Sequence, residues 1–130
     1  MAYVKYNPNP NKIRVGDCVI RSLALATGSD WESTYVKLVF YGFKMADMPS
    51  SNHVWGSFLI DHGFARRELP SGHCRNYTVK NFCKDHPRGL YVIATGSHVV
   101  TAINGNYYDS WNSGDEIITY FFEREVNKNG

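Results

Sequence analysis

The chain has 130 residues, of which 43% are hydrophobic and 20% are charged. This length fits one domain with a buried core, and the composition argues against disorder. The formal net charge is only +2, from 14 basic and 12 acidic residues. Because the positive and negative charges nearly cancel, the net charge gives no support for a nucleic-acid or membrane partner.

Cysteine usage and hydropathy indicate the compartment. There are three cysteines, Cys18, Cys74 and Cys83, and their odd number and irregular spacing do not form a disulfide framework. The N-terminus lacks the apolar core of a signal peptide, and no apolar run reaches the roughly 18 residues needed for a membrane span. We therefore expect a reduced, cytoplasmic protein without a cofactor.

The first half of the chain carries helix signals. Residues 1–11, with two prolines among asparagines, are expected to form an extended arm. A largely buried helix is predicted between Asp17 as N-cap and Gly28 as stop. Ser29 and Glu32 have the spacing of a capping box, which predicts a second helix that runs to about Lys44.

The chain then changes from helices to strands. A third helix is expected from Asn52 to His62, ended by Gly63, and a short strand from Phe64 to Leu69. The remaining elements are a loop at 70–76, a short helix at 79–85 capped by Thr78, strands at 90–95, 97–103, 106–109 and 117–123, and a frayed tail at 126–130. Asn104-Gly105 predicts a tight hairpin turn. The order favours one α+β domain over residues 1–130, with N-terminal helices on one face of a C-terminal antiparallel sheet.

Cys18 stands at the first turn of the first helix. The unpaired N–H groups there lower a thiol pKa and can stabilise an oxyanion. Taken alone, Cys18 fits a small buried hydrophobe better than a nucleophile. A nucleophilic thiol also needs a base, and the base needs a group that orients it.

His98 and Asp109 fit those two roles. They lie six residues before Asn104 and four residues after Gly105, so the hairpin makes them close or diagonal neighbours. Either residue alone would be read as structural. Together with Cys18, they predict a catalytic triad of nucleophile, base and orienting carboxylate.

Three segments carry a resemblance to the papain-like cysteine peptidase superfamily: Gly16-Asp17-Cys18-Val19-Ile20-Arg21, Gly96-Ser97-His98-Val99-Val100 and Tyr107-Tyr108-Asp109-Ser110-Trp111. The last of these is similar to the superfamily's Asn-Ser-Trp, with Asp in place of Asn. The chain also resembles small bacterial or phage members in size. The resemblance implies a papain-like fold, catalytic Cys18, His98 and Asp109, and a supporting Trp111 that shields the His–Asp pair from water.

The resemblance also locates two departures. The Gln that completes the superfamily's oxyanion hole about six residues before the nucleophile is Lys12 here, so Asn11 is the oxyanion candidate and Asn9 a weaker one. The second departure is Val19, directly after the nucleophile, where many relatives have a small or aromatic residue. Asp17 is a supporting residue with three candidate roles: helix cap, partner of Arg21, or electrostatic neighbour of the catalytic pair.

A metal site is not expected. His73, Cys74, Cys83 and His86 share one segment, but their spacing matches no common zinc site, and Cys83 fits a core position. The function that the pattern favours is hydrolysis of a peptide, isopeptide or amide bond in a protein or peptide substrate. The alternative is a catalytically inactive papain-like module that binds a protein, such as a phage host-interaction factor. A third reading is a structural domain in which the Cys, His and Asp are fortuitous.

Overall fold

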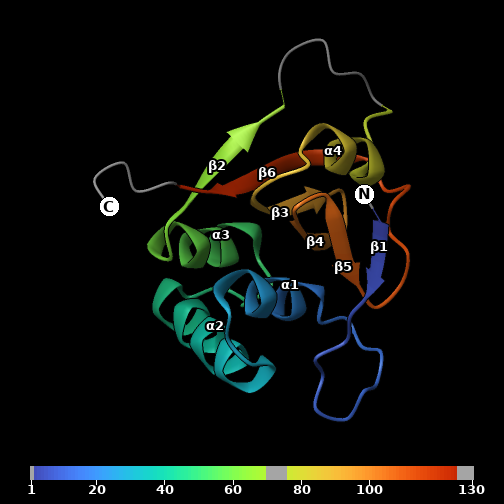
Figure 1. Ribbon diagram of the computed structural model, residues 1–130. Helices are drawn as coiled ribbons and strands as arrows, with labels where there is room; N and C mark the ends of the chain where they lie inside the picture. Colours follow the sequence, from blue (N-terminus) through green and yellow to red (C-terminus); the bar gives the residue numbers. More distant parts are fainter. Residues whose placement is uncertain (1, 70–75, 126–130) are drawn as a thin grey trace.

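The computed structural model describes residues 2–69 and 76–125, which form an α+β fold of four helices and one six-stranded mixed sheet (Figure 1). Of the expected loop at 70–76, residues 70–75 lie outside the described residues, as does the expected tail at 126–130. In chain order the elements are β1 (Ala2–Lys5), α1 (Cys18–Thr27), α2 (Trp31–Met45), α3 (Asn52–Asp61), β2 (Phe64–Glu68), α4 (Val79–Asp85), β3 (Leu90–Thr95), β4 (Val99–Ile103), β5 (Asn106–Asp109) and β6 (Ile118–Arg124).

Local signals place several boundaries. Gly28 ends α1 with φ +70°, the left-handed conformation that glycine adopts at low cost. Thr78 caps α4 through its side chain, which accepts from the Asn81 N–H at 3.2 Å. Asn104 and Gly105 both have positive φ, as the predicted tight turn requires. These three predictions are confirmed.

The capping box predicted for α2 is wrong by one residue. The N-cap is Asp30, whose carboxylate accepts from the Ser33 N–H at 2.7 Å. Ser29 belongs instead to the end of α1, where its N–H donates to the Ala24 carbonyl at 2.9 Å. Two good capping residues stand side by side, and the charged one makes the stronger hydrogen bond to a helix N-terminus.

The sheet has the strand order β1-β5-β4-β3-β6-β2, and it is not purely antiparallel. β1 pairs in parallel with β5, from Ala2 opposite Asn106 to Lys5 opposite Asp109. Part of the expected arm is therefore an edge strand. The prolines at 8 and 10 follow this strand and do not interrupt it, and the Tyr3 ring lies 5.8 Å from that of Tyr107.

Helices cover both faces of the sheet, whereas one covered face was predicted. α1, α2 and α3 lie on one side and α4 on the other (Figure 1). Neighbouring strand residues with opposite side-chain directions are buried in two separate clusters, Val92 and Phe122 with α1 to α3, and Ile93 and Phe121 with α4. Both faces are apolar, so both need a cover.

Within residues 2–69 and 76–125, no helix combines the length and apolar character needed to cross a membrane. The cytoplasmic location stays a prediction.

Candidate active site

Cys18 is the first residue of α1 and is partly exposed. Two buried hydroxyls anchor this helix to β4. Ser22 Oγ donates to the Val99 carbonyl at 2.9 Å, and Thr101 Oγ1 donates to the Ser22 carbonyl at 2.7 Å. These bonds hold the middle of α1 against β4, and His98 directly precedes this strand.

His98 precedes β4, and its side chain is 9% exposed. Its carbonyl accepts from the Thr95 N–H at 2.8 Å, which closes the turn from β3. Its Nε2 lies 2.5 Å from Asp109 Oδ2, and the ring is near enough to the Cys18 thiol that each group shifts the pKa of the other. Because Nε2 is engaged by Asp109, Nδ1 is the nitrogen left for the thiol.

The sheet register explains how His98 meets Asp109. Thr101 lies opposite Tyr108 in the β4–β5 pair. Continuing that register makes His98 and Asp109 diagonal neighbours, as the count from the Asn104-Gly105 turn predicts. The structure therefore brings the three residues of the predicted triad together, in the order sulfur, imidazole, carboxylate.

Asp109 is almost fully buried, with 1% of its surface exposed, and both of its carboxylate oxygens are saturated. Oδ2 accepts from His98 and, at 2.6 Å, from Ser113 Oγ. Oδ1 accepts from the Ser110 N–H at 2.8 Å and from Arg21 Nη2 at 3.1 Å. Burial raises the pKa of Asp109, but the hydrogen bonds from His98 and Ser113 outweigh it and leave the pKa below its usual value.

Arg21 links the helix to this carboxylate. It is buried and forms ion pairs with Asp17 on its own helix and with Asp109 on β5. Asp17 makes no side-chain cap bond and instead accepts from Trp31 Nε1 at 2.9 Å. Of the three roles predicted for Asp17, the structure shows that of partner for Arg21. Because Arg21 lies in an apolar helix, the sequence predicts that a carboxylate pairs with it. The fold shows that Asp109 is a second carboxylate partner, in addition to Asp17.

The charges around the thiol favour a thiolate–imidazolium pair. Burial raises the pKa of Cys18, but the hydrogen bond and charge of His98, the Val99 N–H and the charge of Arg21 together lower it below its ordinary value. Burial lowers the pKa of His98, but its bonds to Asp109 and Cys18 raise it to about 9. A low thiol pKa beside a high imidazole pKa is the condition for a reactive cysteine.

Cys18 and His98 lie between two open pockets that together form a groove. Gly16, Cys18, Ser97 and His98 line both pockets. One pocket, of about 380 Å³, extends toward α3 and the end of β3 and includes Asn52 and Trp55 among its lining residues. The other, of about 440 Å³, extends toward Arg14, Ser110 and Trp111.

Of the predicted supporting residues, Trp111 lies at the site and Asn11 does not. The Trp111 ring lies 4.9 Å from the His98 ring at an interplanar angle of 42°, so it covers the imidazole. Asn11 is exposed, its N–H donates to Asn9 Oδ1 at 2.9 Å, and it is not among the residues that line either pocket. Ser113, which binds Asp109, was missed because nothing in the local sequence marks it.

The other cysteines are outside this site. Cys83 is a residue of α4 that faces the core and is 1% exposed, as predicted, and burial raises its pKa to about 11. Cys74 and His73 lie outside the described residues. Among the residues that the structure does describe, no group of three or more His, Cys, Asp or Glu side chains is placed to hold a metal ion.

Comparison of the chain with protein-family models, curated proteins and solved structures found no match. The resemblance to papain-like peptidases therefore depends on the three sequence segments that carry it.

Proposed function

We propose that this protein is a papain-like cysteine hydrolase that cleaves a peptide, isopeptide or amide bond in a protein or peptide substrate. One observation carries the proposal: Cys18 and His98 line the same two open pockets, and the His98 ring is held by a buried carboxylate at 2.5 Å and lies near enough to the thiol to shift its pKa. A structural cysteine needs neither the ordered base nor the groove.

The reaction would proceed through an acyl-enzyme. His98 takes the thiol proton, and the Cys18 sulfur attacks the carbonyl carbon, so that a C–S bond forms and the oxygen becomes an oxyanion. Collapse breaks the C–N bond, and His98 gives its proton to the leaving amine. Water, deprotonated by His98, then attacks the thioester and releases the acid and the free thiol. Asp109 keeps the ring oriented and stabilises the imidazolium throughout.

The oxyanion would lie at the N-terminus of α1. The first N–H groups of a helix have no intrahelical partner, so the Cys18 and Val19 N–H groups are available donors. Asn11, the donor implied by the resemblance, is exposed and does not line the groove. The proposal therefore relies on the backbone of α1 for this role.

Alkylation by iodoacetamide, read at each cysteine by mass spectrometry, tests the nucleophile. At neutral pH we expect Cys18 to react first and His98→Ala to slow it, because the imidazole holds the thiol as a thiolate. Cys83 is an internal control, since it is buried with a raised pKa. A Cys18 that reacts no faster in the folded protein than in urea would contradict the proposal.

The second candidate is an inactive papain-like module that binds a protein. The observation that favours it is a row of exposed apolar side chains on α2, including Val36 at 65%, Phe40 at 60% and Phe43 at 83% exposure. Exposed apolar patches mark interaction surfaces. The Cys18→Ala variant separates the two functions, because a binding module keeps its biological effect and a hydrolase loses it.

A further inference from the structure

The two pockets of the groove differ in charge. Among the described residues that line the pocket toward α3, none is Lys, Arg, Asp or Glu. The pocket toward Trp111 has two arginines in its lining, Arg14 and Arg21, and none of its described lining residues is Asp or Glu. Both pockets share Cys18 and His98, so the arginines are what makes the two halves of the groove unequal.

Arg14 supplies the positive charge that is not already balanced. Arg21 is buried, and its charge is paired with Asp17 and Asp109. Arg14, in contrast, is exposed, and within the described part of the chain its side chain forms no ion pair or hydrogen bond. One uncompensated guanidinium therefore borders the pocket that contains the proposed nucleophile.

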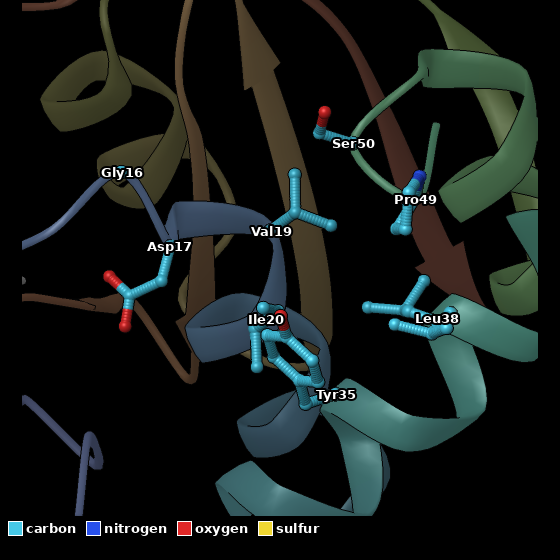
Figure 2. A pocket seen from close by; sticks show the side chains of 9 residues that line it. Gly16, Asp17, Val19, Ile20, Tyr35, Leu38, Pro49 and Ser50 are labelled. Atoms are coloured by element: carbon cyan, nitrogen blue, oxygen red, sulfur yellow. The ribbon is translucent and has the colours of Figure 1, made fainter. Parts of the chain in front are cut away.

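The opposite end of the groove has no equivalent cation. There the neutral pocket adjoins a cavity of about 190 Å³ between α1, α2 and the segment that leads into α3 (Figure 2). Gly16, Val19 and Ser50 line both spaces. Of the described residues around this cavity, none is Lys, Arg or His, and the carboxylate of Asp17 points away from Val19 in Figure 2. A charged ligand is therefore distinguished by the Arg14 end alone.

A carboxylate is the group that the Arg14 end fits. A guanidinium presents its N–H donors in a planar fork that binds both oxygens of a carboxylate. Ser97 and Ser110 line the same pocket, and their hydroxyl groups can add further donors. A lysine or arginine of a ligand would meet a like charge there, which disfavours its binding.

The chain limits how far this charge lies from the nucleophile. Arg14 is four residues before Cys18, so their Cα atoms are at most about 14 Å apart. An extended peptide advances about 3.3 Å per residue, so this distance corresponds to about four substrate residues.

We propose that the Arg14 end of the groove binds a carboxylate of the peptide substrate, on one side of the cleaved bond and within about four residues of it. The carboxylate belongs either to an acidic side chain or to the C-terminus of the substrate. The inference rests on the proposed hydrolase function and names its substrate class.

Alkylation of Cys18 by two reagents of different charge tests the electrostatic part. Iodoacetate and iodoacetamide react in the same way, since the thiolate displaces iodide from each, but only iodoacetate carries a carboxylate. We expect Arg14→Gln to slow iodoacetate about threefold relative to iodoacetamide at low ionic strength. Arg14→Lys is expected to keep the parent ratio, and the effect is expected to shrink in about 1 M salt, where the Debye length is about 3 Å.

Arg88→Gln is the matched control, because Arg88 is exposed and lines neither pocket of the groove. Its ratio of the two rates is expected to equal that of the parent protein. The same ratio in the Arg14→Gln and Arg88→Gln variants would overturn the inference while leaving the hydrolase function standing. A Cys18 that reacts quickly with neither reagent removes the hydrolase function and the inference with it.

Digestion of two randomised peptide mixtures, read by mass spectrometry, identifies the source of the carboxylate. In peptides with amidated C-termini, an acidic side chain as ligand predicts about threefold enrichment of Asp and Glu on one side of the cleaved bond. In peptides with free C-termini, the terminal group as ligand predicts cleavage at a fixed distance from the end.

A charge reversal assigns either preference to Arg14. Arg14→Glu is expected to abolish it and to favour Lys and Arg at the same positions, whereas Arg88→Glu is expected to keep it. Equal frequencies of acidic and basic residues around the cleaved bond, together with indifference to a free C-terminus, would overturn the inference.

Discussion

At the scale of single residues, Asp109 is the group on which the site depends. Its two carboxylate oxygens accept hydrogen bonds from His98, Ser113, Arg21 and a backbone N–H, and the residue is almost fully buried. Removing one partner of a buried ion pair typically costs about 3–5 kcal/mol, because the other charge stays buried and uncompensated. Arg21 and Asp109 therefore support the fold and the site together, and a neutral isostere is a better probe of catalysis than alanine.

Asp109→Asn keeps the shape and removes the charge. We expect the pKa of His98 to fall from about 9 toward its ordinary value of 6.5, because Asp109 is the leading cause of its rise. At pH 7 an imidazole with a pKa of about 9 is almost fully protonated, whereas one near 6.5 is about one quarter protonated. Fewer molecules then hold the thiolate–imidazolium pair, and alkylation of Cys18 is expected to slow by roughly fourfold. Proton NMR titration of the His98 ring and the pH profile of alkylation measure both effects.

Asp115→Asn is the matched control. That carboxylate is 89% exposed and pairs with Lys80 on the surface, so its loss is expected to leave the titration of His98 unchanged. A titration of His98 that is the same in the Asp109→Asn variant and in the parent protein would contradict the role given to Asp109.

At the scale of elements, α1 carries the nucleophile at its N-terminus. The glycines that flank its two ends have different backbone conformations. Gly28 at the C-terminal end has φ +70°, whereas Gly16 before the N-terminal end is not in the left-handed region. A methyl group added at either position would have no atom within 4 Å. Any difference between alanine variants at these two positions is therefore conformational.

Gly28→Ala is expected to lower the free energy of unfolding by about 1–2 kcal/mol, the cost of the left-handed conformation for a residue with a Cβ. Gly16→Ala is expected to leave it unchanged or to raise it slightly, because alanine restricts the unfolded chain. Urea unfolding of the two variants measures the difference. Equal stabilities would show that the end of α1 does not depend on glycine.

At the scale of the whole molecule, the protonation of His98 makes the free energy of unfolding depend on pH. His98 has a folded pKa of about 9, above its ordinary value of 6.5. Protonated His98 therefore stabilises the folded state fully below about pH 6.5, and this contribution is lost as the pH rises through about 9. The stability difference between the protein and its His98→Gln variant is thus expected to be largest in mild acid and to shrink in alkali.

Urea unfolding at about pH 6, 8 and 10 measures this difference. In a Cys18→Ala background the direction is expected to be the same, because Asp109 is still present. A difference that grows with pH would mean that His98 is neutral in the folded protein and would also remove the ion pair from the proposed mechanism.

Local signals in the sequence correctly predicted the features that depend on neighbouring residues. The capping residues at Thr78 and Gly28 and the turn at Asn104-Gly105 act within a few positions, so α4, β3 and β5 lie where the residues predict them. The same turn limits where His98 and Asp109 can meet, and the start of α1 places Cys18 at a helix N-terminus. These signals are local, and their physics does not depend on the rest of the chain.

The remaining features depend on contacts between distant parts of the chain and could not be predicted from local signals. The parallel pairing of β1 with β5, the cover of α4 on the second face and the bond of Arg21 to Asp109 all join segments that are far apart in sequence or in different elements. Considered separately, an edge strand can pair with several other strands, an apolar face can be covered by several helices, and a buried charge can pair with several opposite charges. Packing the whole chain around two cores selects among them, because each choice must also bury the remaining apolar surface.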